Sequence, residues 1–335
     1  METTVELSDQ SGIAQARRSS LALAQSLGLP EKSLANVALV VTEAATNILK
    51  YAGHGQIVLK RFLHGNDRGL AIIALDRGPG IPNLEAARRD GFSTGGSLGA
   101  GLGTIERHSD LFDIYSLDNM GTALVACISA SKPGERNLAN KSHWTIGALS
   151  TPKQGQEICG DAWSTRESNG RLSVTLLDGL GHGPLAADAA GMAVDVFQKA
   201  ADGETPGDTL RRANAQLKAT RGAVMAVAKL DPAANSLTFA GVGNIVAVVA
   251  TNDATQHLIS SDGTVGYNMR LVRESKVDWT PRSVFIATTD GLSTRWNLNR
   301  HPKLLQRHPL LIAHVLHRDF ARDADDASVV VVKAA

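Results

Sequence analysis

The sequence has few of the residues that mark several common classes of protein. Two cysteines, Cys127 and Cys159, are too few for a disulfide framework, and neither lies in the paired spacing of a zinc site. No apolar run approaches the roughly 20 residues that cross a bilayer, and the first residues lack the basic and apolar segments of a signal peptide. We therefore expect a cytoplasmic protein with reduced thiols.

Net charge and aromatic residues are also scarce. The 34 Lys and Arg residues are balanced by 33 Asp and Glu residues, which leaves a formal net charge of +1. Such a balance does not indicate a nucleic acid or a membrane surface as a partner. Aromatic residues make up only 4% of the chain, whereas glycine is abundant at 32 residues. Glycine gathers where a backbone turns sharply or approaches a ligand, so the positions of the glycines guide the search for a site.

The length of 335 residues is about twice that of a usual domain of roughly 150 residues, so two domains are expected. The best boundary is the segment 131–142, which is polar and contains Pro133 and Gly134. It divides the chain into a domain over residues 1–130, a linker over 131–142 and a domain over 143–335.

Hydrophobic spacing in the first domain predicts helices, strands and a glycine-rich loop in an order that favours a layered α+β sandwich. Helical spacing covers 13–27, 33–51 and 101–111, and strand-like stretches cover 56–63, 70–75, 113–116 and 122–129. The second domain has strand-like stretches at 144–149 and 172–177, helical stretches at 185–201 and 209–219, mostly strands over 222–249 and a closing strand at 329–332.

A carboxylate and a carboxamide share one face of the apolar helix expected over 33–51. Glu43 and Asn47 lie four residues apart, the spacing that stacks two side chains on a helix surface. Oxygen atoms of these kinds hold a hydrated divalent cation, and a carboxylate also accepts a proton from a water or a hydroxyl. Taken alone, however, such a pair is more often the solvated stripe of an amphipathic helix.

Two glycine-containing segments follow this helix. Asp76 ends an apolar strand and precedes Gly78 and Gly80, which suits a buried carboxylate that accepts from an exocyclic amine, although a plain turn fits equally well. A glycine-rich run over 93–103 leads directly into a helical pattern. Backbone N–H groups and the helix dipole make such a start a cradle for phosphate, with a flexible loop as the alternative.

These glycines lack the Gly-Lys-Ser/Thr ending of a P-loop and do not follow the first strand of a βαβ unit, so two common nucleotide folds are disfavoured. Three segments in this order, Glu43-x-x-x-Asn47, Asp76-x-Gly78-x-Gly80 and Gly99-x-Gly101-Leu-Gly103, resemble the ATP-site boxes of the GHKL (Bergerat-fold) superfamily. Residues 47–57 and 90–102 extend the resemblance to the anti-sigma-type serine kinases, and among them to the RsbT-type switch kinases of stressosomes.

The resemblance implies an ATP- and Mg²⁺-dependent serine/threonine kinase domain. Asn47 would ligate Mg²⁺, and Glu43 would activate a serine or threonine hydroxyl on a protein substrate. Asp76 would receive the adenine amino group, and Thr122 would support that site. The remaining ATP-binding positions would shape the adenine pocket or close over the phosphates: Gly78, Gly80, Gly95, Gly96, Gly99, Gly101, Leu102 and Gly103.

Acidic residues recur at the edges of apolar, strand-like runs in the second domain. They are Asp161, Asp178, Asp290 and the pair Asp325 and Asp326. An Asp at a strand end is commonly part of a turn, but four such segments in succession are harder to explain in that way. Collected at one end of a sandwich, they would form an oxygen-rich site for two Mg²⁺ or Mn²⁺ ions, which polarise a phosphoryl group and activate a water.

These four segments resemble the PPM (protein phosphatase 2C) superfamily, in particular its short bacterial branch of SpoIIE- and RsbX-type phosphatases. The resemblance implies a PPM-type αββα sandwich for the second domain. Asp178 would bridge two metal ions and the carbonyl group of Gly179 would serve one of them. Asp290 and Asp325 would complete the set of ligands.

Three neighbouring residues have less defined places in this resemblance. Asp161 matches an acidic residue that contacts water on the metal. Asp326 falls where relatives often have Asn, so that Asp325 is the matching ligand. His182 is either a general acid or a loop residue.

Together the two resemblances imply a bifunctional regulator of a stressosome-like partner-switching pathway. One domain would phosphorylate a STAS-domain partner on Ser or Thr with ATP and Mg²⁺, and the other would dephosphorylate it with Mn²⁺ or Mg²⁺. The alternative is an ATP-gated module that captures a partner, in the manner of an anti-sigma protein, fused to an active phosphatase. A third possibility is a phosphatase whose first domain only senses ATP.

Overall fold

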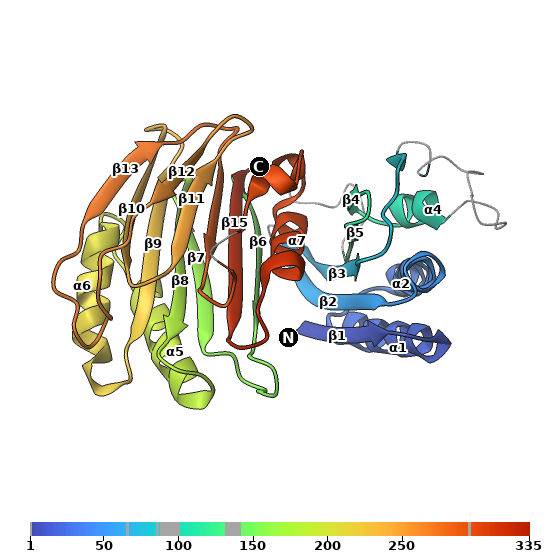
Figure 1. Ribbon diagram of the computed structural model, residues 1–335, viewed down its shortest axis with the longest axis horizontal. Coiled ribbons are helices and arrows are strands. Elements are labelled where there is room, and N and C mark those ends of the chain that lie inside the picture. The colour runs from blue at the N-terminus through green and yellow to red at the C-terminus, as the bar shows by residue number, and fades with distance from the viewer. Residues whose placement is uncertain (1, 65–66, 85–86, 88–100, 131–141, 294–295) are drawn as a thin grey trace. The chain divides into compact units, whose positions relative to one another are not determined.

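The computed structural model describes residues 2–64, 67–84, 87, 101–130, 142–293 and 296–335 (Figure 1). The chain forms two compact units, Met1–Lys141 and Ser142–Ala335. The division falls at the end of the polar segment 131–142 that the sequence predicts as a linker, and residues 131–141 of that segment lie outside the described residues.

The N-terminal unit is built on one antiparallel sheet with the strand order β1-β2-β3-β5-β4. Its strands are β1 (Glu2–Leu7), β2 (Gly55–His64), β3 (Asp67–Asp76), β4 (Leu111–Leu117) and β5 (Gly121–Ser129). Its described helices are α1 (Gln10–Ser26), α2 (Glu31–Tyr51) and α4 (Gly101–Arg107). Alternate strand residues, such as Ile57 and Leu59, share a core with the apolar residues of the helices, so the helices cover one face of the sheet (Figure 1).

Helix α2 places the predicted kinase residues. Its buried residues recur with the helical period, and they are Val37, Val40, Val41, Ala44, Ala45 and Ile48. This stripe fixes the rotation of the helix about its axis, because it packs into the core of the unit. Glu43 and Asn47 fall beside the stripe and are half-buried, so both side chains reach the edge of the helix layer.

The C-terminal unit contains two antiparallel five-stranded sheets, with the orders β13-β10-β9-β8-β7 and β12-β11-β14-β15-β6. The first comprises β7 (Asp161–Ser168), β8 (Arg171–Gly179), β9 (Ala223–Asp231), β10 (Ser236–Val242) and β13 (Glu274–Asp278). The second comprises β6 (Trp144–Thr151), β11 (Val246–Ala250), β12 (Thr255–Leu258), β14 (Val284–Thr288) and β15 (Ala327–Ala334). Both sheets contribute to one core, in which Leu176 and Ala228 of the first meet Phe285 and Val330 of the second.

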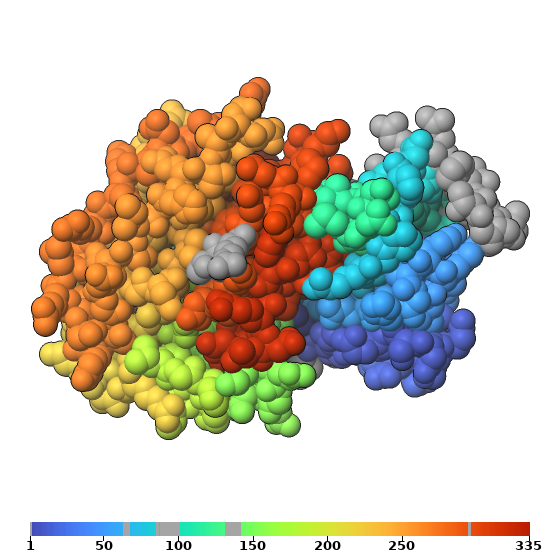
Figure 2. Space-filling view, viewed as in Figure 1, coloured from blue at the N-terminus to red at the C-terminus, as the bar shows by residue number. Residues whose placement is uncertain are grey.

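Helices cover both outer faces of this pair of sheets. They are α5 (Pro184–Gln198), α6 (Pro206–Gln216) and α7 (Pro309–Phe320), with short 3₁₀ helices at Leu217–Ala219, Leu298–Arg300 and Leu304–Gln306. On the first sheet, Phe197 of α5 shares a core with Met225 of β9. On the second, α7 approaches β6 so closely that a Cβ on Gly147 would lie 2.1 Å from the backbone N of Leu310. The chain near α7, orange to red in Figure 2, covers part of the surface of this unit. The unit is therefore the αββα sandwich that the sequence resemblance predicts.

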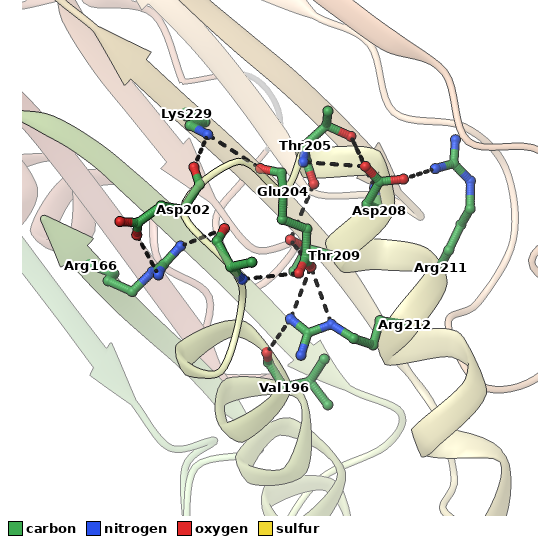
Figure 3. A network of polar contacts seen from close by, with 11 residues as sticks. Arg166, Val196, Asp202, Glu204, Thr205, Asp208, Thr209, Arg211, Arg212 and Lys229 are labelled. Carbon is green, nitrogen blue, oxygen red and sulfur yellow. Dashed lines mark hydrogen bonds and ion pairs between the residues drawn. The ribbon is translucent and has the colours of Figure 1, made fainter. Parts of the chain in front are cut away.

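Polar contacts tie the connection between α5 and α6 to the first sheet (Figure 3). The guanidinium group of Arg212 donates to the carbonyl oxygen of Val196 at 2.7 Å and to Glu204 Oε1 at 2.9 Å. A capping box between Thr205 and Asp208 begins α6. The ammonium group of Lys229 on β9 donates to the carbonyl oxygen of Asp202 at 2.8 Å, which ties the connection to the first sheet.

The structure also corrects part of the sequence prediction. The helix expected over 101–111 ends at Arg107, because the backbone N–H of Asp110 donates to the carbonyl oxygen of Cys127 at 2.8 Å. This bond draws the chain into the sheet, where β4 begins at Leu111. Strands β1, β7, β12 (Thr255–Leu258) and β13 (Glu274–Asp278) and helix α7 were not expected from the sequence.

Candidate active sites

The carboxylate–carboxamide pair of α2 faces the first residue of α4. A Cβ on Gly101 would lie 3.3 Å from Asn47 Nδ2 and 3.3 Å from Glu43 Oε2. Any side chain at position 101 would therefore press on both groups. The structure thus brings together Glu43, Asn47 and Gly101, three of the residues predicted from the sequence.

A second cluster of predicted residues forms around Asp76 at the end of β3. Asp76 Oδ1 accepts hydrogen bonds from the backbone N–H groups of Gly78 at 2.8 Å and Thr122 at 3.1 Å. Gly80 has φ +79°, and a Cβ there would lie 2.1 Å from the carbonyl oxygen of Leu117, so only glycine fits. The carboxylate is therefore held in one orientation by the backbone of its neighbours.

Sequence reasoning missed Ser116, which completes this cluster. Ser116 lies opposite Thr122 in the β4–β5 pair, and their hydroxyl oxygens are 2.9 Å apart. The Ser116 hydroxyl also accepts from the backbone N–H of Ile81 at 2.8 Å. The sequence shows Ser116 only as one of two small polar residues of β4, beside Asp113, and it became informative once the register was known.

The glycine-rich run is described only at its end. Gly95, Gly96 and Gly99 lie outside the described residues. Gly103 is buried in α4, and Leu102 packs against the hydrophobic core of the unit. The described part therefore shows how the run is anchored to the sheet and helix layers.

In the C-terminal unit, predicted acidic residues meet at one end of the sandwich. Asp161 and Asp178 are direct partners across the β7–β8 pair. Asp290 follows β14, and Asp325 and Asp326 precede β15. Like charges directly opposite each other on neighbouring strands are destabilising, so this placement is costly without a cation.

The electrostatics of this cluster reflect that cost. Burial is the main cause that raises the pKa of Asp178 to about 8, and repulsion from Asp161 is the next. Asp290, Asp325 and Asp326 add further repulsion. Burial likewise raises the pKa of Asp161 to about 7. A divalent cation would favour the ionised carboxylates and remove this penalty.

Asp161 provides a direct test of whether a cation site fits here. Its side chain is only 6% exposed, and its Oδ2 accepts from the hydroxyl of Thr289 at 2.7 Å. Its Oδ1 is buried and has no hydrogen-bond partner among the described residues. A buried carboxylate oxygen left in this way needs a donor or a cation, so the residues present fit a hydrated metal ion.

The two neighbouring acids before β15 differ in their surroundings. Asp326 is 3% exposed and accepts from the backbone N–H groups of Lys153 at 2.7 Å and Gly160 at 2.8 Å. Asp325 is exposed, and one of its oxygens accepts from the backbone N–H of Asp326. Asp326 therefore links the segment before β15 to the segment between β6 and β7. Asp325 has the more accessible carboxylate.

Within the described residues, no three His, Cys, Asp or Glu side chains already stand close enough to share one ion. Hydrated Mg²⁺ is usually bound through one or two carboxylates, with waters or backbone oxygens completing its shell. Gly179 supplies a backbone carbonyl next to Asp178, and its tight packing leaves no room for a side chain, because a Cβ would lie 2.1 Å from the carbonyl oxygen of Ala186. The donor set therefore matches a water-rich site better than a closed protein cage.

Further residues around the acids were not found from the sequence. Asn244 donates through Nδ2 to Asp290 Oδ2 at 2.7 Å, and Arg322 donates to the carbonyl oxygen of Asp290. Thr289, which adjoins Asp290 in the chain, could have been noticed from its position. Asn244 could not, because it comes from the end of a different strand. His182 is exposed in the segment between β8 and α5.

No helix in the described ranges is long and apolar enough to cross a membrane.

Comparison with known families assigns each unit separately. Residues 7–128 match the histidine kinase-like ATPase domain family (HATPase_c_2). Residues 168–335, half of the chain, match the stage II sporulation protein E family (SpoIIE). The two matches do not overlap and follow the division into two units.

Relatives of known name agree with these families. The serine/threonine-protein kinase RsbT of Bacillus subtilis (strain 168) is 38% identical over 125 residues, which make up 37% of this chain and 94% of RsbT. The phosphoserine phosphatase RsbX of the same organism is 25% identical over 142 residues, 42% of this chain and 71% of RsbX.

Solved structures resemble the larger unit. RsbX in complex with magnesium superposes with a TM-score of 0.52 at 22% identity, over 58% of this chain and 98% of RsbX. A chain of the bacterial stressosome, described as a modular system adapted to control secondary messenger signaling, gives a TM-score of 0.53 at 24% identity, over 57% and 99% of the two chains. At these identities the likeness shows the fold, which confirms the phosphatase-type sandwich. The chain therefore belongs to the SpoIIE family through its C-terminal unit, and it is a fusion of that unit with a histidine kinase-like ATPase unit of the RsbT kinase family.

Proposed function

We propose that this chain both adds phosphate to and removes phosphate from Ser or Thr of a STAS-domain partner, in a stressosome-like partner-switching pathway. The observation that carries the proposal is that one chain holds two different clusters of polar side chains, each of a kind that suits phosphate chemistry. One is the Glu43 and Asn47 pair against Gly101, and the other is the carboxylate cluster around Asp178. The named relatives, a serine/threonine kinase and a phosphoserine phosphatase, support the opposed activities, and a stressosome chain among the structural neighbours supports the pathway.

In the N-terminal unit, ATP and Mg²⁺ would supply the phosphoryl group and neutralise its charge. Asn47 would hold the cation through its carboxamide oxygen. Glu43, one helical turn earlier on α2, would accept the proton of the attacking hydroxyl. Asp76, which its neighbours hold in one orientation, would accept a hydrogen bond from the adenine amino group. The glycines proposed to close over the phosphates are Gly95, Gly96, Gly99, Gly101 and Gly103.

In the C-terminal unit, two Mg²⁺ or Mn²⁺ ions, when bound, would polarise the phosphoryl group and activate a water. Asp178, the carbonyl group of Gly179, Asp290 and Asp325 would hold them. Asp161 would orient a water in the site through Oδ1, since the hydroxyl of Thr289 already occupies its Oδ2. Asp178 is the residue on which the site depends most, because it faces Asp161 across the strands and feels every other carboxylate of the cluster.

Joining opposed activities on one chain has a physical consequence. A linker raises the effective concentration of each unit at a partner that the other unit holds. Without control, the pair would consume ATP in a futile cycle. We therefore expect partner binding or nucleotide state to set the balance between the two activities.

The test follows phosphoserine on a STAS-domain protein over time, with purified protein, ATP, Mg²⁺ and Mn²⁺. The wild-type protein should phosphorylate the partner transiently, and the Asp178→Asn variant should leave it phosphorylated. Asp253→Asn serves as the matched control, because Asp253 is exposed in the turn between β11 and β12. If the signal decays in Asp178→Asn as it does in the wild type, the metal site is wrong. If phosphoserine never appears in that variant, the first unit is not a kinase for this partner.

A further inference from the structure

An arginine lies over the segment that follows Asp178. The backbone N–H of Leu180 donates to the carbonyl oxygen of Gly222 at 3.1 Å, which joins this segment to the residues just before β9. Gly181 has φ +88°, and a Cβ on it would lie 3.1 Å from Arg221 Nη1. The guanidinium group of Arg221 is therefore packed against the loop that begins at Gly179, at the end of the sheet where the carboxylates meet.

The backbone of Arg221 is held in place by a defined turn. The Thr220 hydroxyl donates to the carbonyl oxygen of Leu217 at 2.7 Å and accepts from the backbone N–H of Gly222 at 3.0 Å. Gly222 has φ +82°, and a Cβ on it would lie 2.7 Å from the carbonyl oxygen of Val265. The backbone of Arg221 is therefore held at one point beside the loop that begins at Gly179.

Two arginines over the same sheet have acidic partners. Arg166 pairs with Asp202 at 3.3 Å and Arg212 with Glu204 at 2.9 Å (Figure 3). In contrast, no hydrogen bond or ion pair joins the exposed Arg221 side chain to another residue in the described ranges. A cation that has no such partner in the described ranges, at the edge of an acidic cluster, is available to an incoming anion.

The second arginine near the cluster has a different role. Arg322 donates through Nη2 to the carbonyl oxygens of Asp290 and Leu292. Its side chain is thereby tied to the backbone that carries a proposed ligand, and its charge lowers the pKa of Asp290 against the larger effect of burial. Arg322 therefore supports the loop after β14. The guanidinium group of Arg221 makes no such bond in the described ranges.

We propose that Arg221 binds the phosphate group of the phosphoserine or phosphothreonine substrate. This rests on the phosphatase function proposed above. A phosphate dianion that approaches five carboxylates meets repulsion that the metal ions only partly offset, and a planar guanidinium matches two phosphate oxygens at once. Arg221 would contact the substrate in the ground state and in the transition state alike, so it lowers KM more than it raises kcat.

The experiment uses the full chain with Mn²⁺ and compares wild type, Arg221→Ala, Arg221→Lys and a control. The control is Arg282→Ala, because Arg282 is exposed in the turn before β14, at the opposite end of that strand from Asp290. Two quantities are measured: the KM and kcat for a phosphoserine peptide, and the Kd for orthophosphate by equilibrium dialysis. Thermal unfolding of each variant is followed in parallel.

Arg221→Ala should raise the KM and the orthophosphate Kd by about 10-fold, the size of a lost charge-assisted hydrogen bond, with a smaller change in kcat. Arg221→Lys should restore part of the binding, because it keeps the charge without the planar fork. Arg282→Ala should match the wild type in both quantities. Unchanged phosphate binding in Arg221→Ala, or a fall in kcat without a rise in KM and Kd, would overturn the assignment.

The phosphate measurement separates this proposal from the phosphatase function itself. If the peptide is not hydrolysed by any form of the protein, the proposed phosphatase function fails. If orthophosphate binding still depends on Arg221 in that case, the proposal that Arg221 binds phosphate stands. Binding that is lost in Asp178→Asn but retained in Arg221→Ala would place the phosphate on the metal ions alone and overturn the role of Arg221.

Discussion

The two units present their carboxylates in opposite ways. In the N-terminal unit, the backbone N–H groups of Gly78 and Thr122 satisfy Asp76, and Glu43 stands beside an amide rather than another acid. In the C-terminal unit, Asp161 and Asp178 face each other, and their pKa values are raised to about 7 and about 8. The carboxylate of Asp76 is thus satisfied by the protein itself, whereas the buried carboxylates of the second unit carry an electrostatic cost that a cation would relieve. The comparison predicts that the units respond differently to mutation, metal and pH.

The largest expected effect belongs to Glu43, because a general base acts in the chemical step. Glu43→Gln keeps the shape of the side chain and removes its basicity, so phosphorylation of the partner should fall by about 10²- to 10⁴-fold. ATP binding should persist, since the proposed nucleotide contacts are made by other residues. Phosphatase activity of the same variant should be unchanged. Initial rates with radiolabelled ATP measure the first quantity, and equilibrium binding of ATP measures the second.

The control for this prediction is Glu31→Gln, on the same helix. Glu31 is exposed in the first turn of α2, three turns away from Gly101's contacts with Glu43 and Asn47. It should have wild-type kinase activity. Undiminished phosphoryl transfer by Glu43→Gln would show that Glu43 is not the base. Absence of transfer in the wild type, together with tight ATP binding, would instead favour a module that captures a partner.

The next largest effects come from glycines whose neighbours leave no room for a side chain. Gly121 has φ +82°, and a Cβ on it would lie 2.1 Å from the carbonyl oxygen of Asp76. Gly179 is equally confined against the carbonyl oxygen of Ala186. Alanine at either position should cost about 3 kcal/mol or more, since backbone has to move. Gly121→Ala should weaken ATP binding, and Gly179→Ala should lower the stability of the phosphatase unit.

Tryptophan makes this experiment selective. All four tryptophans, Trp144, Trp163, Trp279 and Trp296, lie in the C-terminal unit, so their emission follows that unit. Matched controls are Gly28→Ala and Gly155→Ala, because both positions have positive φ but nothing within 4 Å of a Cβ. Each control should cost only about 1–2 kcal/mol, the strain of a left-handed backbone. The N-terminal unit has no tryptophan, so ATP affinity reports on Gly121→Ala and Gly28→Ala. Equal losses of ATP affinity in these two variants would show that the close approach to Asp76 does not matter.

The sequence predicted elements with a clear local hydrophobic pattern and missed those without one. The helical period of α2 is local, so its core face and the shared face of Glu43 and Asn47 were predictable. Helix α7 was missed because Leu310 to Leu316 are all buried, which removes the polar face that marks a surface helix. Strand β7 is largely polar and lies at a sheet edge, so it has little hydrophobic alternation.

The site residues, like the helices and strands, were predictable where the signal is local in the sequence. Motif order predicted one site with Asp161, Asp178, Asp290 and Asp325, and the structure pairs Asp161 with Asp178 across two strands, where the other two carboxylates raise the pKa of Asp178. Ser116 and Asn244 were not predictable, because each acts through a partner that only the strand register or the packing of a distant loop supplies. Local patterns thus gave the residues of each motif, and long-range packing added the residues that orient them.

Metal should stabilise the phosphatase unit by a moderate amount. A cation that binds only the folded state at 100 times its Kd adds about 2.7 kcal/mol to the free energy of unfolding. Asp178→Asn should abolish this gain, yet stabilise the metal-free protein by up to about 1 kcal/mol, because it removes a charge opposite Asp161. Thermal unfolding followed by tryptophan emission, with EDTA or with Mn²⁺, measures both changes. Asp253→Asn should keep the full response to Mn²⁺, and a full response in Asp178→Asn would contradict the proposed ligand set.

The smallest expected effect concerns His317 on α7. Its Nε2 is 2.7 Å from the hydroxyl of Thr151, and burial lowers its pKa to about 4, while Asp323 acts weakly in the opposite direction. The unfolded chain takes up this proton near pH 6.5 and the folded chain only near pH 4. The unfolded state thus binds more protons in that interval, so stability falls as pH falls. From pH 7 to pH 4 the loss should be about 1–3 kcal/mol.

His317→Gln isolates this contribution, because glutamine keeps a polar group near Thr151 but cannot titrate. Urea unfolding with tryptophan emission at each pH measures the free energy of unfolding of both proteins. From pH 7 to pH 4 the variant should gain stability relative to the wild type by about 1–3 kcal/mol, the contribution of the histidine. His257→Gln is the control, since His257 is exposed on β12 and should not alter the acid response. The acidic cluster works in the other sense: its raised pKa values make the metal-free unit less stable as pH rises toward 8. If the free energy of unfolding changes equally with pH in His317→Gln and in the wild type, the acid response belongs to groups other than this histidine.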